Sequence, residues 1–250
     1  MRALLDFVFP LRCAGCDRPG VLLCESCRMA VASIDPAAAC PRCGAPMPCA
    51  ECRGRTFAFS AARCAALLEP PVSSAVVALK DGGERRYASL LAGLLMTASD
   101  GWLEADDVLV PAPASPAALR RRGFDHATDI ARALGRRTGN HVESLLRASA
   151  GADQRALGRE ARFANRSAAF SVVGPRRVGI ECALPGRVVL VDDVFTTGAT
   201  LDAAARVLRQ AGVSEVRALA VARAVERPSV SPATLQRLSP GSVVAGAQAP

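Results

Sequence analysis

Hydrophobic and polar positions divide the chain into three regions of different character. Residues 13–52 show little apolar periodicity and are rich in Pro and Gly, whereas from Phe57 onward apolar runs alternate with turns. The last part of the chain is rich in Pro, Ser, Gly and Ala, a composition typical of disordered segments. We therefore predict a small module at residues 1–56, a main domain at 57–226 and a disordered tail at 227–250.

Within the main domain the pattern alternates between strands and helices. Short apolar runs predict strands at 188–191, 216–221 and, closed by prolines, 108–110. Apolar positions at helical spacing predict helices at 87–98, 125–137 and 200–211, and further elements are expected at 61–68 and 72–79. The polar segment 150–169 is expected to be a mobile loop or a marginal helix. The alternation indicates an α/β fold with a parallel sheet and helices on both faces.

Hydropathy and cysteine content bear on the compartment. No apolar stretch reaches the roughly 18 residues that a membrane helix needs. The first nine residues carry Arg2 and Asp6 and show no cleavage site, so we expect no signal peptide. A cytoplasmic location is predicted, and thiols stay reduced there. Ten cysteines in such a chain therefore point to metal binding rather than to disulfides.

Eight cysteines form four Cys-x-x-Cys pairs in the first 52 residues: Cys13 and Cys16, Cys24 and Cys27, Cys40 and Cys43, Cys49 and Cys52. Each pair can offer two thiolates to one tetrahedral ion, so four pairs predict two structural sites, and all-sulfur sets at this spacing favour Zn(II). Metal binding is expected to drive the folding of this module. A disulfide scaffold and an iron–sulfur cluster are the alternatives. The spacing leaves open which pairs share an ion. Cys64 and Cys182 lie outside the pattern and are expected to be small buried hydrophobes.

Charge is unevenly distributed along the chain. The formal net charge is +8, and the stretch 120–187, with 14 Arg and 6 acidic residues, carries all of it. This excess suggests an anionic ligand in the main domain, although a solvated Arg-rich face would have the same composition. Lys80 is the only lysine in the chain, which makes it a candidate for a role that requires a compact charge.

The most informative stretch is an apolar strand followed by two acids, a small hydroxyl-rich turn and a helix. Asp192 and Asp193 end the apolar run and can accept hydrogen bonds from ribose hydroxyls, directly or through water on Mg(II). Backbone N–H groups at a helix start form an anion site, and glycine allows close approach of a phosphate. The predicted phosphate cradle consists of Thr196, Thr197, Gly198, Ala199 and Thr200.

This combination resembles the signature with which type I phosphoribosyltransferases bind phosphoribosyl pyrophosphate (PRPP). The order of cysteine pairs, Leu79–Gly83, Val110–Pro113, Arg121–Ala127 and the PRPP loop resembles the ComF (GntX-like) family. Members of that family join a double zinc ribbon to a phosphoribosyltransferase domain. The resemblance covers about residues 1–223. One departure is visible, because Asp125 and His126 stand where the family usually has Asn and Gln.

The resemblance also implies roles for residues outside the acidic loop. Pyrophosphate would be held by a loop formed by Pro111, Ala112 and Pro113, with backbone N–H groups and the nearby Arg120, Arg121 and Arg122 as candidates. A mobile loop at 154–166 would close over PRPP and supply a catalytic cation, with Arg162 favoured over Arg155. Lys80 would meet a phosphate or the acceptor. His126 is a possible acid or base, although a lone histidine is more often a surface or packing residue.

The implied reaction is transfer of ribose 5-phosphate from PRPP, with Mg(II), to an acceptor that the sequence does not identify. Pyrophosphate would be released. Asp192, Asp193 and Arg162 would be the catalytic residues. Two other functions fit the same residues: a non-catalytic accessory of DNA uptake that binds single-stranded DNA and a motor protein, and a sensor that binds PRPP without turnover.

Overall fold

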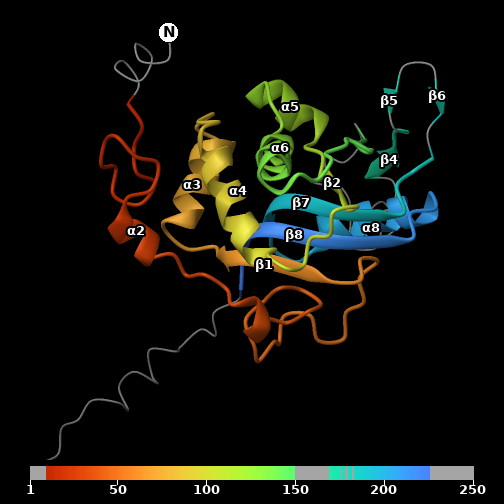
Figure 1. Cartoon of the computed structure of the whole chain (residues 1–250), viewed down its shortest axis with the longest axis horizontal. Coiled ribbons are helices and arrows are strands. Elements are labelled where there is room, and N and C mark those ends of the chain that lie inside the picture. The colour runs from red at the N-terminus through yellow and green to blue at the C-terminus, as the bar shows by residue number, and fades with distance from the viewer. Residues whose placement is uncertain (1–9, 150–168, 175, 178–179, 182, 226–250) are drawn as a thin grey trace, which may run out of the picture.

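The computed structural model of the chain describes residues 10–149, 169–174, 176–177, 180–181 and 183–225 (Figure 1). The predicted tail at 227–250 and most of the segment 150–169 lie outside these ranges, as does Cys182. A membrane-spanning helix is absent from the described part of the chain.

A four-stranded parallel sheet forms the centre of the molecule (Figure 1). In spatial order its strands are β1 (Ala62–Leu67), β8 (Glu215–Arg223), β7 (Arg187–Phe195) and β2 (Val108–Pro111). The two inner strands, β7 and β8, are buried along nearly their whole length. Parallel strands covered on both faces read as continuous apolar runs, which explains why these two segments do not alternate with polar residues.

Helices cover both faces of this sheet. One face carries α3 (Val72–Lys80), α4 (Tyr87–Ala98) and α6 (His126–Thr138), whose buried side chains pack around Val189 and Val191 of β7. The other face carries α8 (Ala199–Gln210), which packs against Val188 and Leu190. Successive residues of a strand point to opposite faces, so β7 contributes to both halves of the core.

The remaining elements are short. They are α2 (Glu25–Met29), a 3-10 helix (Pro36–Ala38), α5 (Pro116–Arg122), and the strand pairs β3 (Leu146–Ala148) with β4 (Phe170–Val172) and β5 (Arg176–Arg177) with β6 (Ile180–Glu181).

The predicted α/β fold with a parallel sheet is confirmed, and the helices and strands expected in the main domain are present within a few residues. The largest difference concerns β7, which we predicted to end at Val191. It continues to Phe195, so Asp192 and Asp193 belong to the strand itself. Pairing with β8 explains the extension, because Val194 and Phe195 lie opposite Ala222 and Arg223.

The first cysteine-rich segment, residues 13–27, and the second, residues 40–52, pack against different parts of the main domain. Cys40, Cys43 and Cys52 belong to the same buried cluster as α8 and its face of the sheet. Backbone hydrogen bonds also join the second segment to β1, for example from the Ala62 N–H to the Pro41 carbonyl at 2.9 Å. Cys13 and Cys24 instead form a small cluster with Leu23, against α4. The second segment is therefore part of the main core.

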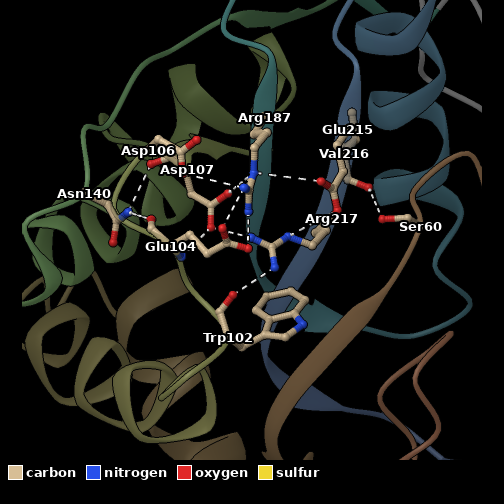
Figure 2. A network of polar contacts seen from close by, with 10 residues as sticks. All are labelled: Ser60, Trp102, Glu104, Asp106, Asp107, Asn140, Arg187, Glu215, Val216 and Arg217. Carbon is tan, nitrogen blue, oxygen red and sulfur yellow. Dashed lines mark hydrogen bonds and ion pairs between the residues drawn. The ribbon is translucent and has the colours of Figure 1, made fainter.

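A network of charges fixes the edge of the sheet where β7 and β8 begin (Figure 2). The Asp107 carboxylate is fully buried and forms ion pairs with Arg217 of β8 and with Arg187 of β7, the latter at 3.3 Å. Arg217 also donates to the Trp102 carbonyl at 2.8 Å and lies 4.5 Å from the centre of the Trp102 ring. The network ties the loop before β2 to the first residues of both inner strands.

Removing the Asp107 carboxylate should therefore be costly. In an Asp107→Ala variant the Arg217 guanidinium, whose side chain is 9% exposed, would remain buried with only its longer ion pair to Glu215 at 3.8 Å. We expect a loss of about 3–5 kcal/mol in the free energy of unfolding, measured by urea denaturation. Asp106→Ala is the control, because that side chain is 70% exposed and its pair with Arg187 is long at 3.7 Å. A change of less than about 1 kcal/mol in both variants would contradict this account.

Candidate functional site

The two acids predicted to bind ribose lie at the carboxyl end of β7, in the middle of the sheet. Asp192 and Asp193 are 9% and 4% exposed, respectively. The Asp193 N–H donates to the Asp192 side chain at 2.8 Å. In parallel α/β sheets ligands bind at the edge formed by the carboxyl ends of the strands, so these carboxyl groups occupy the expected position for a site.

Basic side chains from two helices converge on Asp193. Lys80, the last residue of α3, donates to Asp193 Oδ2 at 2.9 Å, and His126 Nε2, at the start of α6, lies 3.3 Å from the same oxygen. Arg122 Nη1 lies 3.4 Å from His126 Nδ1, and its Nη2 lies 3.5 Å from Asp81. These contacts form one continuous chain from Asp81 through Arg122 and His126 to Asp193 and Lys80.

These contacts separate the two carboxyl groups in protonation. Burial raises the pKa of Asp192 well above its usual value, and the negative charge of Asp193 raises it further. Burial also acts to raise the pKa of Asp193, but the hydrogen bond and charge of His126, together with Lys80, outweigh it and hold that pKa well below its usual value. The two pKa values therefore shift in opposite directions, which favours the protonated form of Asp192 and the ionised form of Asp193.

The predicted phosphate cradle forms the turn between β7 and α8. Gly198 caps the helix with a left-handed φ of 77°, and a Cβ there would lie 2.6 Å from the Phe195 ring, so only glycine fits. Thr196, Thr197 and Thr200 are exposed at this helix start, where hydroxyls and the helix dipole favour an anion. The turn has the local geometry that the sequence predicts.

The segment Pro111–Ala112–Pro113 does not offer the backbone donors that the resemblance implies. Neither proline has an N–H group, and the Ala112 N–H donates to the Val191 carbonyl at 2.9 Å as the sheet ends. The next N–H, of Ala114, donates to Asp125 at 3.0 Å. The expectation of N–H donors from this segment was therefore wrong, because the sheet and the α6 cap already use them.

Arg122 is better placed than this loop to hold an anion. Its side chain is only 10% exposed, and it lies between His126 and Asp81. Among the described residues nothing accepts a hydrogen bond from its buried Nε. Arg162 and Arg155, expected in a closing loop, lie outside the described residues, so their roles stay predictions.

Sequence reasoning undervalued three residues of the site. His126 was expected more often as a surface or packing residue, yet it is buried against Asp193. Asp125 caps α6, accepting from Ala127 at 3.0 Å, and so aims the helix start at the site. Asp81, beside Lys80 in sequence, contacts Arg122. The departure of residues 125 and 126 from the family pattern was the available signal for the first two.

The acidic pair could also hold a cation. His126, Asp192 and Asp193 each offer one ligand atom, and these atoms lie within 4.8 Å of one another. Oxygen ligands suit Mg(II), which is commonly bound by one or two carboxylates plus substrate phosphates. The residues present therefore fit a magnesium ion that is delivered with a phosphorylated ligand.

The cysteines form two compact clusters with sequential pairing. Cys13, Cys16, Cys24 and Cys27 make the first, and Cys40, Cys43, Cys49 and Cys52 make the second. The sulfur–sulfur distance is 3.6 Å for Cys16 and Cys24 and 3.5–3.7 Å for three pairs within the second cluster. A tetrahedron with Zn–S bonds of about 2.3 Å has edges of about 3.8 Å, so both sets fit one zinc ion each. Cys64 is buried and lies outside both clusters, as expected.

Comparisons with known proteins agree with this geometry. Residues 185–238 match the family model described as phosphoribosyl transferase domain. The chain is 28% identical over 197 residues to the DNA utilization protein YhgH of Escherichia coli (strain K12), covering 74% of this chain and 83% of that protein. It is 32% identical over 125 residues to competence protein F of Haemophilus influenzae, covering 49% and 52%. The chain is a homologue of these ComF-type proteins. Like the ComF pattern, it combines a phosphoribosyltransferase-type domain with two clusters of four cysteines each.

Solved structures of lower similarity were also found. One is a hypoxanthine phosphoribosyl transferase of Trypanosoma cruzi, 15% identical with a TM-score of 0.33, covering 60% of this chain and 72% of that chain. Another is the hypoxanthine-guanine phosphoribosyl transferase of L. donovani, 15% identical with a TM-score of 0.30, covering 58% and 72%.

Opposite pKa shifts predict opposite effects of two similar substitutions. Asp192→Asn keeps the acceptor for the Asp193 N–H and removes a carboxyl group that is costly to bury, so at pH 7 it should stabilise the fold by about 1 kcal/mol. Asp193→Asn removes the partner of Lys80 and His126 and should cost roughly 2 kcal/mol. Urea denaturation at pH 7 measures both.

The pH dependence provides the control for this pair. A lowered native pKa stabilises the fold above the pKa of an unfolded Asp, about 4, and this gain is lost as the pH falls below it. The wild type should therefore lose its advantage over Asp193→Asn under acid. The benefit of Asp192→Asn should also fade there, because the unfolded carboxyl group is then protonated as well. If both substitutions changed the free energy of unfolding equally at pH 7, the opposite pKa shifts of Asp192 and Asp193 would be contradicted.

Proposed function

We propose that this protein binds PRPP at the carboxyl end of β7 and transfers its ribose 5-phosphate to an acceptor, with release of pyrophosphate. The observation that carries the proposal is the buried pair Asp192 and Asp193, held by Lys80 and His126 directly before a helix start capped by Gly198. The family match at residues 185–238 supports it, because that stretch contains both the acidic pair and the turn.

Each part of the site suits one part of PRPP. The turn 196–200 would bind the 5-phosphate through hydroxyls and the positive end of α8. The ionised Asp193 would accept hydrogen bonds from ribose hydroxyls, and Asp192, whose pKa is raised by burial, would accept when ionised and could also donate when protonated. Arg122 and Lys80 would face the pyrophosphate. Bound Mg(II) would neutralise part of the pyrophosphate charge.

The reaction needs orientation and charge rather than a protein nucleophile. The bond between ribose C1 and the pyrophosphate oxygen breaks, and its electron pair leaves on the pyrophosphate while the acceptor forms the new bond to C1. The ribose ring becomes cationic in such a transition state, and the fixed negative charge of Asp193 would stabilise it. Holding both reactants together supplies the rest of the rate enhancement.

The acceptor has a candidate position beside this site. A hollow of about 480 Å³ lies next to the end of β2, lined by apolar side chains such as Pro113, Leu119 and Leu146 and by the polar Asp125 and Ser144. Its mixed lining suits a flat, partly polar molecule such as a base.

Zinc is the metal we propose for both cysteine clusters, with one structural ion in each. Thiolate ligands of this kind persist in a reducing compartment, so we propose a cytoplasmic location.

Calorimetric titration of PRPP with Mg(II) into the zinc-loaded protein tests the proposal. We expect saturable binding by the wild type and at least a roughly 100-fold loss of affinity in the double variant Asp192→Asn, Asp193→Asn, because both ribose acceptors are altered. Asp106→Asn, an exposed acid at the opposite edge of the sheet, serves as the control and should bind normally. Absence of PRPP binding by the wild type would refute the proposal. Release of pyrophosphate with a panel of bases then separates an enzyme from a sensor.

A second candidate function is an accessory of DNA uptake that binds single-stranded DNA and a motor protein. Two relatives carry the names DNA utilization protein and competence protein F. A hollow of about 430 Å³ between α4 and α6 is lined by Arg85, Arg86, Arg132 and Arg136, and the last two are exposed. Salt-sensitive binding of single-stranded DNA that weakens in Arg132→Gln, Arg136→Gln would favour this function.

A further inference from the structure

One buried arginine ends strand β8 beneath the proposed phosphate turn. Arg223 is 2% exposed, and its Nη1 donates to the carbonyls of Phe195 at 3.1 Å and Thr196 at 2.6 Å. Its guanidinium also lies 4.7 Å from the centre of the Phe195 ring. The Arg223 side chain therefore binds two consecutive carbonyls of the backbone that leads from β7 into the turn.

The same guanidinium reaches the second cysteine cluster. Its Nε donates to the Cys43 carbonyl at 3.1 Å, and its Nη2 lies 3.5 Å from the carboxylate of Glu51. Cys43 is a member of that cluster, and Glu51 stands between two others, Cys49 and Cys52. Arg223 thus joins the backbone of the turn to the backbone of the metal cluster.

A second arginine makes a parallel link. Arg55 Nη1 donates to the Thr197 carbonyl at 3.1 Å, while the Arg55 N–H donates to the Cys52 carbonyl at 3.1 Å. Close to this link, the rings of Phe57 and Phe195 meet edge to face with centroids 6.1 Å apart, and both rings crowd Gly198. Two hydrogen-bonded arginines and an aromatic contact therefore connect the second cluster to residues 195–198.

The first cysteine cluster makes its contacts elsewhere. Cys13 and Cys24 pack with Leu23 and Leu90, and the Tyr87 hydroxyl donates to the Arg12 carbonyl at 2.6 Å. Both Tyr87 and Leu90 belong to α4, on the opposite face of the sheet from α8. The two clusters share one chemistry but lie against different parts of the molecule.

The segment that carries the second cluster has little regular structure to fix its shape. Residues 39–58 contain turns, bends and one isolated bridge but no helix or strand. In such a segment the metal holds the backbone in place. Thiolate–metal bonds would therefore fix the Cys43 carbonyl, Glu51 and Arg55 in addition to the packing of Cys40, Cys43 and Cys52 in the core. Without it, Arg223 would lose two of its partners in a buried location, where unpaired charge is costly.

We propose that Arg223 is a positioning residue through which the metal at Cys40, Cys43, Cys49 and Cys52 holds the 195–198 turn in its phosphate-binding shape. Loss of this ion would loosen the turn and weaken phosphate binding, whereas loss of the ion at the first cluster would leave the turn intact. The ligand named here rests on the proposed function. The link between metal and turn is independent of it.

Amide hydrogen exchange reports on the turn directly, whether or not PRPP binds. The N–H of Asp202 donates to the Gly198 carbonyl at 2.8 Å, and that of Ala224 donates to the Phe195 carbonyl at 3.0 Å. We would compare two matched variants, Cys49→Ser with Cys52→Ser and Cys16→Ser with Cys27→Ser. Each should retain one of two zinc ions, but only the first should accelerate exchange at these amides, by at least tenfold. Equal exchange at the turn in both variants would overturn the proposal.

Arginine substitutions test the same link with all cysteines present. Arg223→Met is compared with Arg217→Met, because both arginines are buried on β8 at opposite ends of the strand. Both variants should keep two zinc ions and lose stability, but only Arg223→Met should accelerate exchange at Asp202 and Ala224. If Arg223→Met does not fold, Arg223→Lys keeps the charge but cannot bridge both backbones, and it should show the same local effect. Unchanged exchange at the turn would overturn the proposal.

PRPP titration of the same variants separates this inference from the proposed function. Affinity should fall at least tenfold in the second-cluster and Arg223 variants and stay normal in the first-cluster and Arg217 variants. If the wild type fails to bind PRPP while the exchange pattern holds, the proposed function fails and the link stands. If the wild type binds PRPP but the turn exchanges alike in all variants, the function stands and the link fails.

Discussion

Two carboxyl groups buried side by side at the end of β7 set the constraint that the rest of the site satisfies. Burial opposes the ionised form of both, and only Asp193 is compensated, by Lys80 at 2.9 Å and His126 at 3.3 Å. That compensation requires α3 to end and α6 to begin above the same strand. The Asp125 cap, which begins α6 at His126, and Arg122, which contacts His126, belong to the same arrangement.

At the opposite edge of the sheet a buried carboxylate is again paired with basic side chains, but there the pairs join strands to one another. Asp107 is also buried, but its partners Arg187 and Arg217 complete a closed network at the start of β7 and β8 (Figure 2). Buried ion pairs are costly to break, which favours one register of the inner strands. Strand β8 thus carries a buried arginine near each end: Arg217 fixes the sheet, and Arg223 contacts the turn that leads into α8.

Several features of the fold and site could be predicted because they depend on residues near one another in sequence. The apolar run 188–191, the acids Asp192 and Asp193 and the glycine at 198 specify a strand, a pair of acceptors and a helix start. The cysteine spacing specified two four-thiolate sites in the same way. The end of β7 was misjudged, because its extension depends on pairing with Ala222 and Arg223 in β8. The donors expected at Pro111–Pro113 failed for a similar reason, since Val191 takes the Ala112 N–H.

The sequence by itself determined the α/β alternation, the two carboxyl groups before a glycine turn and the two sets of four cysteines, because local spacing and side-chain chemistry are sufficient for each. Only the tertiary structure decided which cysteine pairs share an ion, that His126 reaches Asp193, and that Arg223 joins the second cluster to the turn. These contacts link residues that are distant in sequence, 67 positions apart for His126 and Asp193 and 180 for Arg223 and Cys43. Packing of the helices and of the second cysteine-rich segment on the sheet brings these residues together. The spacing of apolar residues along the chain does not predict that packing.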